Sequence, residues 1–433
     1  MADVMELKAY LCPNCGAESQ LDARFVSWCL RCEHGADPYP PELTGRQRRR
    51  LDREAQRSDE LFRMLEKAPS LRPASALGLA VTVLAVMVHL IGVLTLVLPV
   101  LWLLAGGPAV PAGFAILVGA LTFVTVRPRL PRKLKPDFGF GREEAPHLYA
   151  VLDRCAAELG CQVPERVALD AEFNASTGRA GLARRSFLII GAPLWAVLTG
   201  PERVALLGHE LGHQVNGDAT RSLPAVTALR SLTEWLRLTH PKQSAGERAT
   251  ARKMRSRSAG TGIGALLVPL VTAVMFLPFF LIALGCQAGL NRLRLLCGQR
   301  AEYLADELGA RLAGTNAVLG VVSKFGFGPS LRVFVGARKA KKAIEKPDLT
   351  TFWADFRGYV ESMPDTEVQR RLVVDRLRNT RTDRSHPADH LRIALLRERA
   401  QQPGTLSVSA EEWAAVDAEL AGRMTAAARK ALS

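Results

Sequence analysis

The sequence predicts a mainly helical membrane protein, and two uncharged runs carry this prediction. No Asp, Glu, Lys or Arg occurs in the 54 residues 73–126, and a second uncharged run covers the 34 residues 258–291. A helix needs about 20 apolar residues to cross a hydrocarbon core of about 30 Å, so the first run is long enough for two crossings. The soluble segments show helical periodicity, and short strand patterns at 163–173 and 185–191 predict a small sheet.

Charge and cysteine content indicate which partners and which cellular compartment the protein has. The net charge of +15 over 433 residues fits either nucleic acid or the anionic face of a membrane as partner. The uncharged runs favour the membrane, so we expect no nucleic-acid partner. A membrane-anchored nucleic-acid-binding regulator stays as an alternative that rests on charge and one cysteine motif alone. The eight cysteines show no disulfide framework and favour a reducing compartment. The N-terminus has no signal-peptide pattern, so the first membrane helix is expected to serve as targeting signal.

Four cysteines near the N-terminus are spaced as a zinc ribbon. Cys12 and Cys15 form one C-x-x-C pair, and Cys29 and Cys32 form a second pair after thirteen intervening residues. The segment is too small to bury much core, so bound Zn²⁺ would supply its folding free energy. Two redox pairs are the alternative, but no βαβ pattern surrounds them. The segment contains only two cations, so we expect a structural or protein-docking module rather than a DNA reader.

Basic residues flank the first uncharged run on both sides. Residues 41–70 are charged and predicted to be helical, and residues 127–135 contain five cations and no acid. The positive-inside rule therefore places both ends of a helical hairpin, and the N-terminus with them, in the cytoplasm. The basic run before the hairpin is expected to be attracted to anionic lipid. Its arginines are Arg46, Arg48, Arg49, Arg50, Arg53 and Arg57.

The second uncharged run predicts a different kind of membrane segment. It is interrupted by Pro269 and Pro278 and is followed at once by Arg292 and Arg294. The run is too long for one ordinary crossing and short for two full ones. Because cations flank both ends, we expect a re-entrant segment or a short hairpin that returns to the same side of the bilayer.

Residues 203–218 carry the chemistry of the chain. His209 and His213 lie four residues apart with Glu210 between them, in a segment that has helical start and end signals. Residues i and i+4 share one face of a helix, so both imidazoles can bind one metal ion. Two histidines fill half of a tetrahedral Zn²⁺ shell, and Glu210 is placed to accept a proton from the attacking water. A third protein ligand must come from elsewhere.

A helix predicted over residues 292–313 supplies that ligand. It carries Glu302 and Asp306 four residues apart, on one helical face. We expect Glu302 to be the third zinc ligand and Asp306 to hold the free ring nitrogen of a ligating histidine. Two such acids more often belong to a solvated helical face. Because a histidine motif lies upstream, we favour a metal site instead. The assignment requires both helices to lie on one side of the bilayer.

These motifs resemble those of the HtpX-like integral-membrane zinc endopeptidases, whose relatives include the CAAX prenyl endopeptidases. The matching segments, in family order over roughly 137–400, are Phe173-Asn-Ala-Ser176, His209-Glu-Leu-Gly-His213, Asn216-Gly-Asp218, Glu302-Tyr-Leu-Ala-Asp306 and His386-Pro with Arg392-Ile393. The resemblance implies a gluzincin fold of helices and a small sheet, with Zn²⁺ held by His209, His213 and Glu302 and with Glu210 as general base.

The resemblance also implies roles for residues around the metal. Asn174 and Ala175 correspond to the edge strand that aligns the substrate. Asp218 and Asp306 would lie behind the zinc ligands and support them. His386 and Arg392 would lie near the oxyanion of the transition state.

The segments predicted from the sequence are a zinc ribbon (1–40), a basic helical linker (41–74), a transmembrane hairpin (75–126), a first peptidase part (127–257), a second membrane segment (258–291), a second peptidase part (292–400) and a helical tail (401–433).

We expect a zinc endopeptidase of the inner cell membrane, multi-pass, with its N-terminus and active site in the cytoplasm. Its substrates would be membrane or membrane-associated proteins, in protein quality control, and the ribbon would offer a site for a protein partner. The alternative is a non-enzymatic membrane-tethered adaptor whose ribbon recruits partners. Zinc stoichiometry distinguishes the two, because a peptidase with a ribbon binds about two ions per chain and a ribbon-only adaptor about one.

Overall fold

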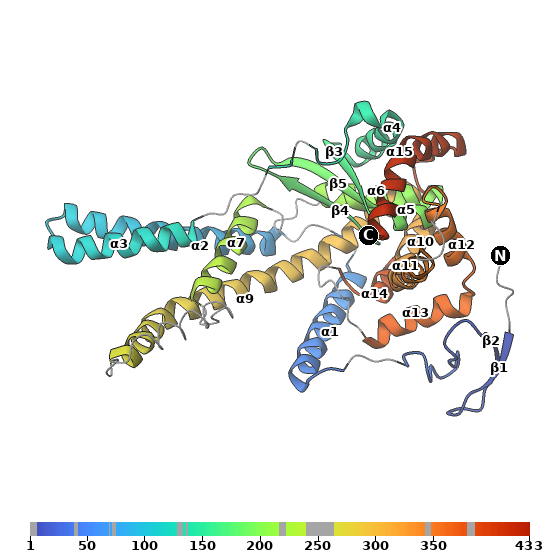
Figure 1. The fold of residues 1–433 in the computed structure, drawn as a ribbon, viewed down its shortest axis with the longest axis horizontal. Helices are drawn as coiled ribbons and strands as arrows, with labels where there is room; N and C mark the ends of the chain where they lie inside the picture. Colours follow the sequence, from blue (N-terminus) through green and yellow to red (C-terminus); the bar gives the residue numbers. More distant parts are fainter. Residues whose placement is uncertain are drawn as a thin grey trace. The chain divides into compact units, whose positions relative to one another are not determined.

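The structure is a computed structural model, and it describes residues 7–38, 42–68, 70–71, 75–127, 133–135, 137–215, 222–239, 264–342, 348–378 and 386–433. The chain is mainly helical with a small sheet, as predicted (Figure 1). It divides into two compact units. Unit 1 comprises Met1–Pro73, Lys133–Asp218 and Gly298–Ser433, and unit 2 comprises Ala74–Arg132 and Ala219–Cys297.

The sheet of unit 1 has three strands, in the order β3 (Arg166–Asp170), β5 (Arg185–Gly191) and β4 (Ala175–Ala180). The central strand β5 is parallel to β3 and antiparallel to β4. Alternate β5 side chains, those of Ser186, Leu188 and Ile190, are buried, as expected where one face of a strand packs on a core. Strand β4 is therefore an edge strand with one hydrogen-bonding side directed away from the sheet.

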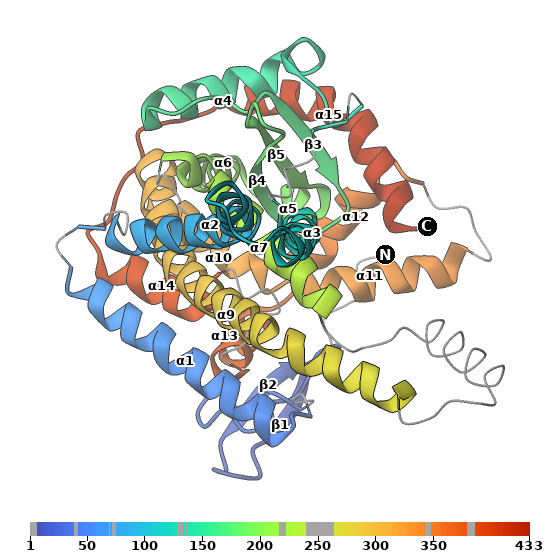
Figure 2. The same cartoon turned by 90° about the vertical axis from the view of Figure 1, so that its left-hand side faces the viewer.

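Helices pack around this sheet and enclose one hydrophobic core. Helix α4 (Pro146–Leu159) lies beside α15 (Ala410–Ala431), which also contacts β3 (Figure 2), and α6 (Gly200–Val215) packs against both α4 and β4. The core includes side chains of α5 and α12, such as Trp195 and Phe356, which are fully buried. The other elements after the sheet are α5 (Ala192–Val197), α10 (Thr315–Phe325), α11 (Gly328–Lys342), α12 (Phe352–Glu361), α13 (Asp365–Arg378) and α14 (Asp389–Glu398), and the 3-10 turn η1 (Arg142–Glu144) precedes α4.

The C-terminal tail is part of this core. Ser409 and Glu412 form a capping box at the start of α15. Trp413 of α15 is buried and stacks edge-on against Trp195, with ring centroids 5.6 Å apart. The Arg203 guanidinium lies over both rings and forms an ion pair with Asp417 at 2.9 Å. Through these contacts with Arg203, the C-terminal tail stabilises α6.

The N-terminal segment also belongs to unit 1. Strands β1 (Leu7–Leu11) and β2 (Glu18–Asp22) pair in antiparallel fashion, and α1 (Gly45–Glu66) follows with Thr44 as its N-cap. Leu61 and Leu65 of α1 are buried in a cluster with residues of α14. Helix α1 is therefore docked through its C-terminal half, while its described arginines are exposed.

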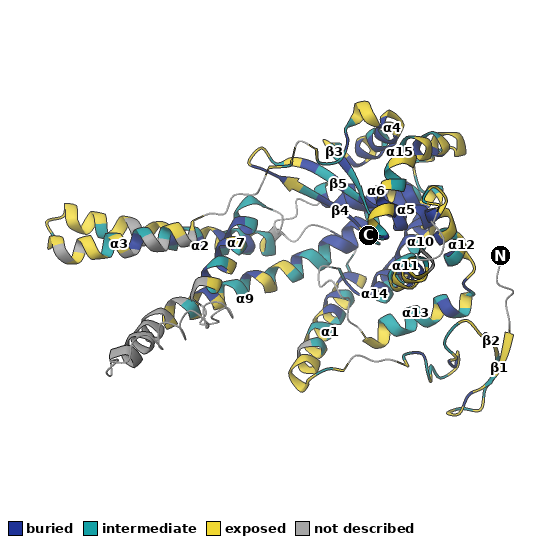
Figure 3. Ribbon diagram, viewed as in Figure 1, coloured by how far each residue is buried: buried dark blue, intermediate teal, exposed yellow. Residues whose placement is uncertain are grey.

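Unit 2 is a bundle of long apolar helices. It contains α2 (Ser75–Leu104), α3 (Ala109–Val126), α7 (Leu223–Thr239) and the first part of α9 (Gly264–Ala313). Within the described residues, Ala76–Leu94 and Phe280–Ala313 are long and apolar enough to cross a membrane. Large apolar side chains along α2, such as those of Leu90 and Leu101, are exposed (Figure 3). Such a surface is suited to lipid.

Helix α7 is an element that the sequence did not reveal, because residues 219–257 read as a polar, basic stretch. Its Ala225, Ala228 and Leu232 are buried in the core of unit 2. In addition, Oγ1 of Thr227, in α7, lies 3.0 Å from Nε2 of the His89 imidazole. His89 of α2 thus packs against a neighbouring helix.

The prediction of a re-entrant segment or short hairpin at 258–291 is wrong for the residues that the structure describes. Residues Gly264–Ala313 form one continuous helix, α9, of 50 residues, which includes Pro269 and Pro278. A proline removes one helical hydrogen bond, and neighbouring helices can tolerate that loss in an apolar environment. Proline alone was therefore weak evidence for a turn. Residues 258–263 lie outside the described part of the chain.

Candidate active site and metal centres

Helix α6 presents two histidines from one face. His209 and His213 are both buried, and their rings lie edge to face with centroids 4.9 Å apart. Gly208 and Gly212 precede these two histidines and allow α9 to approach α6 closely. A Cβ atom at Gly212 would lie 3.2 Å from Cα of Ala305. The glycines therefore bring the backbone of α9 within reach of the imidazoles.

Helix α9 brings Glu302 to both histidines, as the sequence predicts. Its Oε2 lies 3.4 Å from Nε2 of His209, and its Oε1 lies 3.4 Å from Nε2 of His213. His386, at the start of the segment before α14, contacts Oε2 of the same carboxylate through Nδ1. Four side chains from three segments thus meet at one buried point.

These donor atoms fit a zinc ion. Zinc bonds of about 2.1 Å in a tetrahedron separate the ligand atoms by about 3.4 Å, which is the separation of Glu302 from each histidine. Glu210 provides independent support, because its Oε2 is buried and has no hydrogen-bond partner among the described residues. A buried carboxylate oxygen without a partner is costly unless a water or ion is bound beside it. The Glu210 backbone is fixed by Thr177 of β4, whose hydroxyl donates to its carbonyl oxygen at 3.2 Å.

Asp306 holds His209 from behind, as predicted. Its Oδ1 lies 2.9 Å from Nδ1 of His209, which leaves Nε2 directed at Glu302. Burial by itself lowers the pKa of His209, but hydrogen bonds to Asp306 and Glu302 outweigh it and raise the pKa to about 9. The two acids therefore stabilise a protonated His209, and Asp306 would keep the proton on Nδ1 when Nε2 binds zinc.

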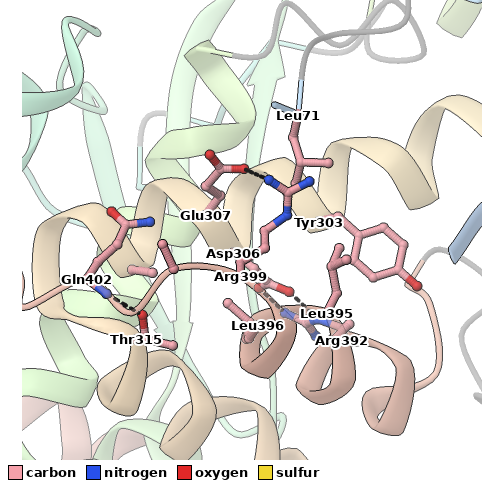
Figure 4. Close-up of a pocket in the computed structure, with 12 residues that line it drawn as sticks. Leu71, Tyr303, Asp306, Glu307, Thr315, Arg392, Leu395, Leu396, Arg399 and Gln402 are labelled. Atoms are coloured by element: carbon pink, nitrogen blue, oxygen red, sulfur yellow. Dashed lines mark hydrogen bonds and ion pairs between the residues drawn. The ribbon is translucent and has the colours of Figure 1, made fainter. Parts of the chain in front are cut away.

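Arg392 occupies a different place from the one predicted. We expected it near the oxyanion, but its guanidinium is buried and forms two hydrogen bonds to Asp306, from Nε at 2.8 Å and from the terminal nitrogen at 2.6 Å (Figure 4). Asp306 is a buried anion, and a buried anion needs a cation to offset its desolvation. Arg392 is therefore a positioning residue in the series Arg392, Asp306, His209.

A cleft of about 710 Å³ reaches His386 from the surface. Phe173 and Asn174, just before β4, lie along one side, and Phe325 and Leu331 of the α10–α11 region line it further. Asn174 is exposed to the cleft, whereas Ala175 is buried as the first residue of β4. The predicted substrate-aligning segment thus borders the cleft that leads to the metal site. Asp218 lies outside the described residues.

The four N-terminal cysteines form a second candidate metal site. All four Sγ atoms lie within 4.8 Å of one another, with Cys12 3.6 Å from Cys32 and Cys15 3.5 Å from Cys29. Zinc–sulfur bonds of about 2.3 Å in a tetrahedron give an S–S separation of about 3.8 Å. A hydrogen bond from Asn14 and a backbone hydrogen bond from His34 lower the pKa of Cys32 to about 6, which favours its thiolate.

The comparison with protein families decides the class of this chain. A model of peptidase family M48 matches residues 142–400, more than half of the sequence. The chain belongs to peptidase family M48. The resemblance to HtpX-like and CAAX-type peptidases is thereby confirmed, and this M48 member is a protease by family. No curated protein and no solved structure matches it.

The match defines which parts of this M48 peptidase are typical of the family. It contains the histidine motif, Glu302, His386 and Arg392, and it ends before α15. The N-terminal ribbon and the helices α1, α2 and α3 lie outside it, as the match begins at residue 142. The family match therefore assigns no role to the ribbon.

Proposed function

We propose that this M48 peptidase is a membrane-embedded zinc endopeptidase that hydrolyses peptide bonds of membrane or membrane-associated proteins at the cytoplasmic face, in protein quality control. The observation that carries the proposal is that one Glu302 oxygen lies 3.4 Å from Nε2 of His209 and the other lies 3.4 Å from Nε2 of His213, beside a buried Glu210 oxygen without a partner among the described residues. The two long apolar helices and their basic flanks support the membrane location.

His209, His213 and Glu302 would hold the zinc ion. When bound there, zinc supplies Lewis-acid polarisation of the scissile carbonyl and lowers the pKa of a nearby water. Glu210 lies next to His209 on the same helix, and its Oε2 accepts the proton of the attacking water. The same carboxyl group then returns the proton to the leaving amine.

His386 lies between Glu302 and the cleft. Its Nδ1 contacts Glu302, and its ring borders the cleft. A histidine in this place stabilises negative charge at the carbonyl oxygen by donating a hydrogen bond, an effect that commonly contributes about 3–4 kcal/mol. Arg392 acts in this proposal by holding Asp306, to which its Nε and one terminal nitrogen donate.

The test is the variant Glu210→Gln in full-length protein, purified in detergent. We expect the variant to keep about two zinc ions per chain, as wild type does, and to lose cleavage of fluorescein-labelled casein by about a thousandfold or more. Equal cleavage by wild type and variant would reject the mechanism. One zinc ion per chain in wild type, with no cleavage, would instead support the membrane-tethered adaptor.

The substrate class is tested in cells. Membranes that contain wild-type protein are compared by quantitative proteomics with membranes that contain the Glu210→Gln form. Under the proposal, membrane proteins with cytoplasmic segments accumulate in the variant and their fragments appear only in wild type. Fragments confined to soluble proteins would contradict the proposed substrate class.

A further inference from the structure

The N-terminal ribbon, residues 7–38, is docked on unit 1 by specific contacts. Phe25 of the ribbon packs against the main hydrophobic core. Arg24 donates to the carbonyl oxygen of Ser362, at the C-terminal end of α12, at 2.8 Å. Arg370 of α13 donates to the carbonyl oxygen of Ala36 at 2.8 Å. Both views of the ribbon diagram place β1 and β2 next to α13 (Figures 1 and 2).

Complementary charges add to this docking. Arg378 forms two hydrogen bonds with Asp37, at 2.8 Å from Nε and 2.6 Å from the terminal nitrogen. Arg376 also pairs with Glu33, but through one nitrogen only. Two acidic side chains that follow the second cysteine pair, those of Glu33 and Asp37, thus contact arginines of α13. Planar two-point pairing fixes orientation as well as distance.

The docked ribbon borders the cleft that leads to His386. Val26, Asp37 and Pro38 line the cleft from the ribbon, and Phe173 and Asn174 line it from the segment before β4. Clefts of about 300–1,000 Å³ enclose most of a drug-sized ligand, so a volume of about 710 Å³ suits a short stretch of polypeptide. A polypeptide in this cleft would touch the ribbon on its way to the metal site.

The lining of the cleft combines apolar side chains with charges of both signs. Phe173, Phe325 and Leu331 are apolar, and Val26 and Val374 add to them. Asp37 and Arg378 neutralise each other. The remaining charged residues of the lining are Arg332, Arg370, Arg371, Glu172, Asp375 and Asp389, three of each sign. A cleft that combines apolar side chains with balanced charges suits unfolded polypeptide of mixed sequence rather than a strongly acidic or strongly basic one.

We propose that the ribbon is a wall of the substrate cleft and contacts the polypeptide substrate directly, with the Asp37–Arg378 pair holding it in position. The inference rests on the proposed peptidase function and assigns to the ribbon a part in binding unfolded polypeptide. The thiolate site then serves this purpose by keeping residues 26 and 37 in place, because so small a segment depends on its metal for folding.

Photocrosslinking tests the contact without depending on turnover. The variants Val26→p-benzoylphenylalanine and Leu11→p-benzoylphenylalanine are made in full-length Glu210→Gln protein and irradiated with fluorescein-labelled casein. Leu11 is the matched control, since it is a ribbon residue, 64% exposed, that does not line the cleft. We expect at least fivefold more crosslinked casein from position 26 than from position 11. Equal or lower yield from position 26 would overturn the proposal.

A charge swap tests the positioning pair by kinetics. We expect Asp37→Arg and Arg378→Asp each to raise KM for casein about fivefold and to change kcat less than twofold, because the metal site is untouched. The double variant restores a pair of opposite charges and should return KM to within twofold of wild type. The control is Arg154→Ala, which breaks an exposed ion pair with Glu412 away from the cleft and should leave KM unchanged.

The outcomes separate this inference from the proposed function. If wild type cleaves casein and Glu210→Gln does not, the peptidase function stands. Unchanged KM in both single variants, or equal defects in the singles and the swap, would then reject the ribbon's role alone. If wild type and Glu210→Gln are equally inactive, the proposed function fails, and the crosslinking ratio still decides whether casein occupies the cleft.

Discussion

Gly212 controls how closely α6 and α9 approach each other, and Gly212→Ala tests this control. A Cβ atom at position 212 would lie 3.2 Å from Cα of Ala305 and 3.2 Å from Cδ1 of Leu308. Both contacts are shorter than ordinary van der Waals separations of about 3.5–4.0 Å. The leucine end can rotate away, but Cα of Ala305 belongs to the backbone. The two helices must therefore move apart by a few tenths of an ångström.

Two opposing effects set the size of the change in stability. Alanine is favoured over glycine inside a helix by about 1 kcal/mol. Overpacking a close contact costs about 1–3 kcal/mol. The free energy of unfolding should therefore fall by about 0–2 kcal/mol. The separation also moves His213, the next residue, away from Glu302, so we expect zinc affinity at this site to fall about tenfold.

The control is Gly422→Ala on α15, where an added Cβ would meet nothing within 4 Å. That variant gains helix propensity without a clash and should be more stable by about 0.5–1 kcal/mol. Thermal unfolding followed by tryptophan fluorescence measures stability, and competition with a fluorescent chelator measures zinc affinity. The reasoning is refuted if Gly212→Ala is stabilised as much as Gly422→Ala and binds zinc as tightly as wild type.

Three further predictions concern the buried ion pair, the ribbon and one buried tyrosine. Arg392→Leu leaves Asp306 buried without its cation, so the free energy of unfolding should fall by about 3–5 kcal/mol; an unchanged thermal midpoint would contradict this. Cys32→Ser should reduce bound zinc from about two ions to about one per chain by mass spectrometry, and retention of both would reject the four-thiolate site. Burial raises the pKa of Tyr149 to about 12, above its usual value of about 10, so wild type should lose stability between pH 10 and 12 as the unfolded chain releases this proton. Tyr149→Phe should lose less over that range in unfolding experiments, and an identical pH profile would exclude the effect.

The geometry of the candidate metal site was the most predictable part of this protein. Helical geometry alone places His209 and His213 on one face, because residues four apart lie one above the other. Glu302 was found by ligand chemistry, since an acid on a later helix completes the shell. The same reasoning found Asp306, which supports His209. These predictions needed only local spacing and the coordination preferences of zinc.

Long-range partners were not predictable in this way. Arg392 and Asp306 are 86 positions apart in sequence, and Arg378 and Asp37 are 341 positions apart. No periodicity connects such residues, so the resemblance placed Arg392 near the oxyanion and the ribbon's docking surface was missed. The signal that could have shown Arg392 as a supporting residue is thermodynamic. Asp306 behind a ligating histidine is a buried anion, and a buried anion needs a buried cation.

Helix α9 shows why the topology argument gave a sound constraint and a wrong element. The constraint was that Glu302 must lie on the same side of the bilayer as the histidines, and the 3.4 Å separations satisfy it whatever path the chain takes. The hairpin was inferred separately, from flanking cations and from Pro269 and Pro278. Continuous helix through Gly264–Ala313 removes the hairpin without weakening the constraint. Ligand geometry is the stronger evidence, because it tests a distance, whereas proline and charge only bias a backbone path.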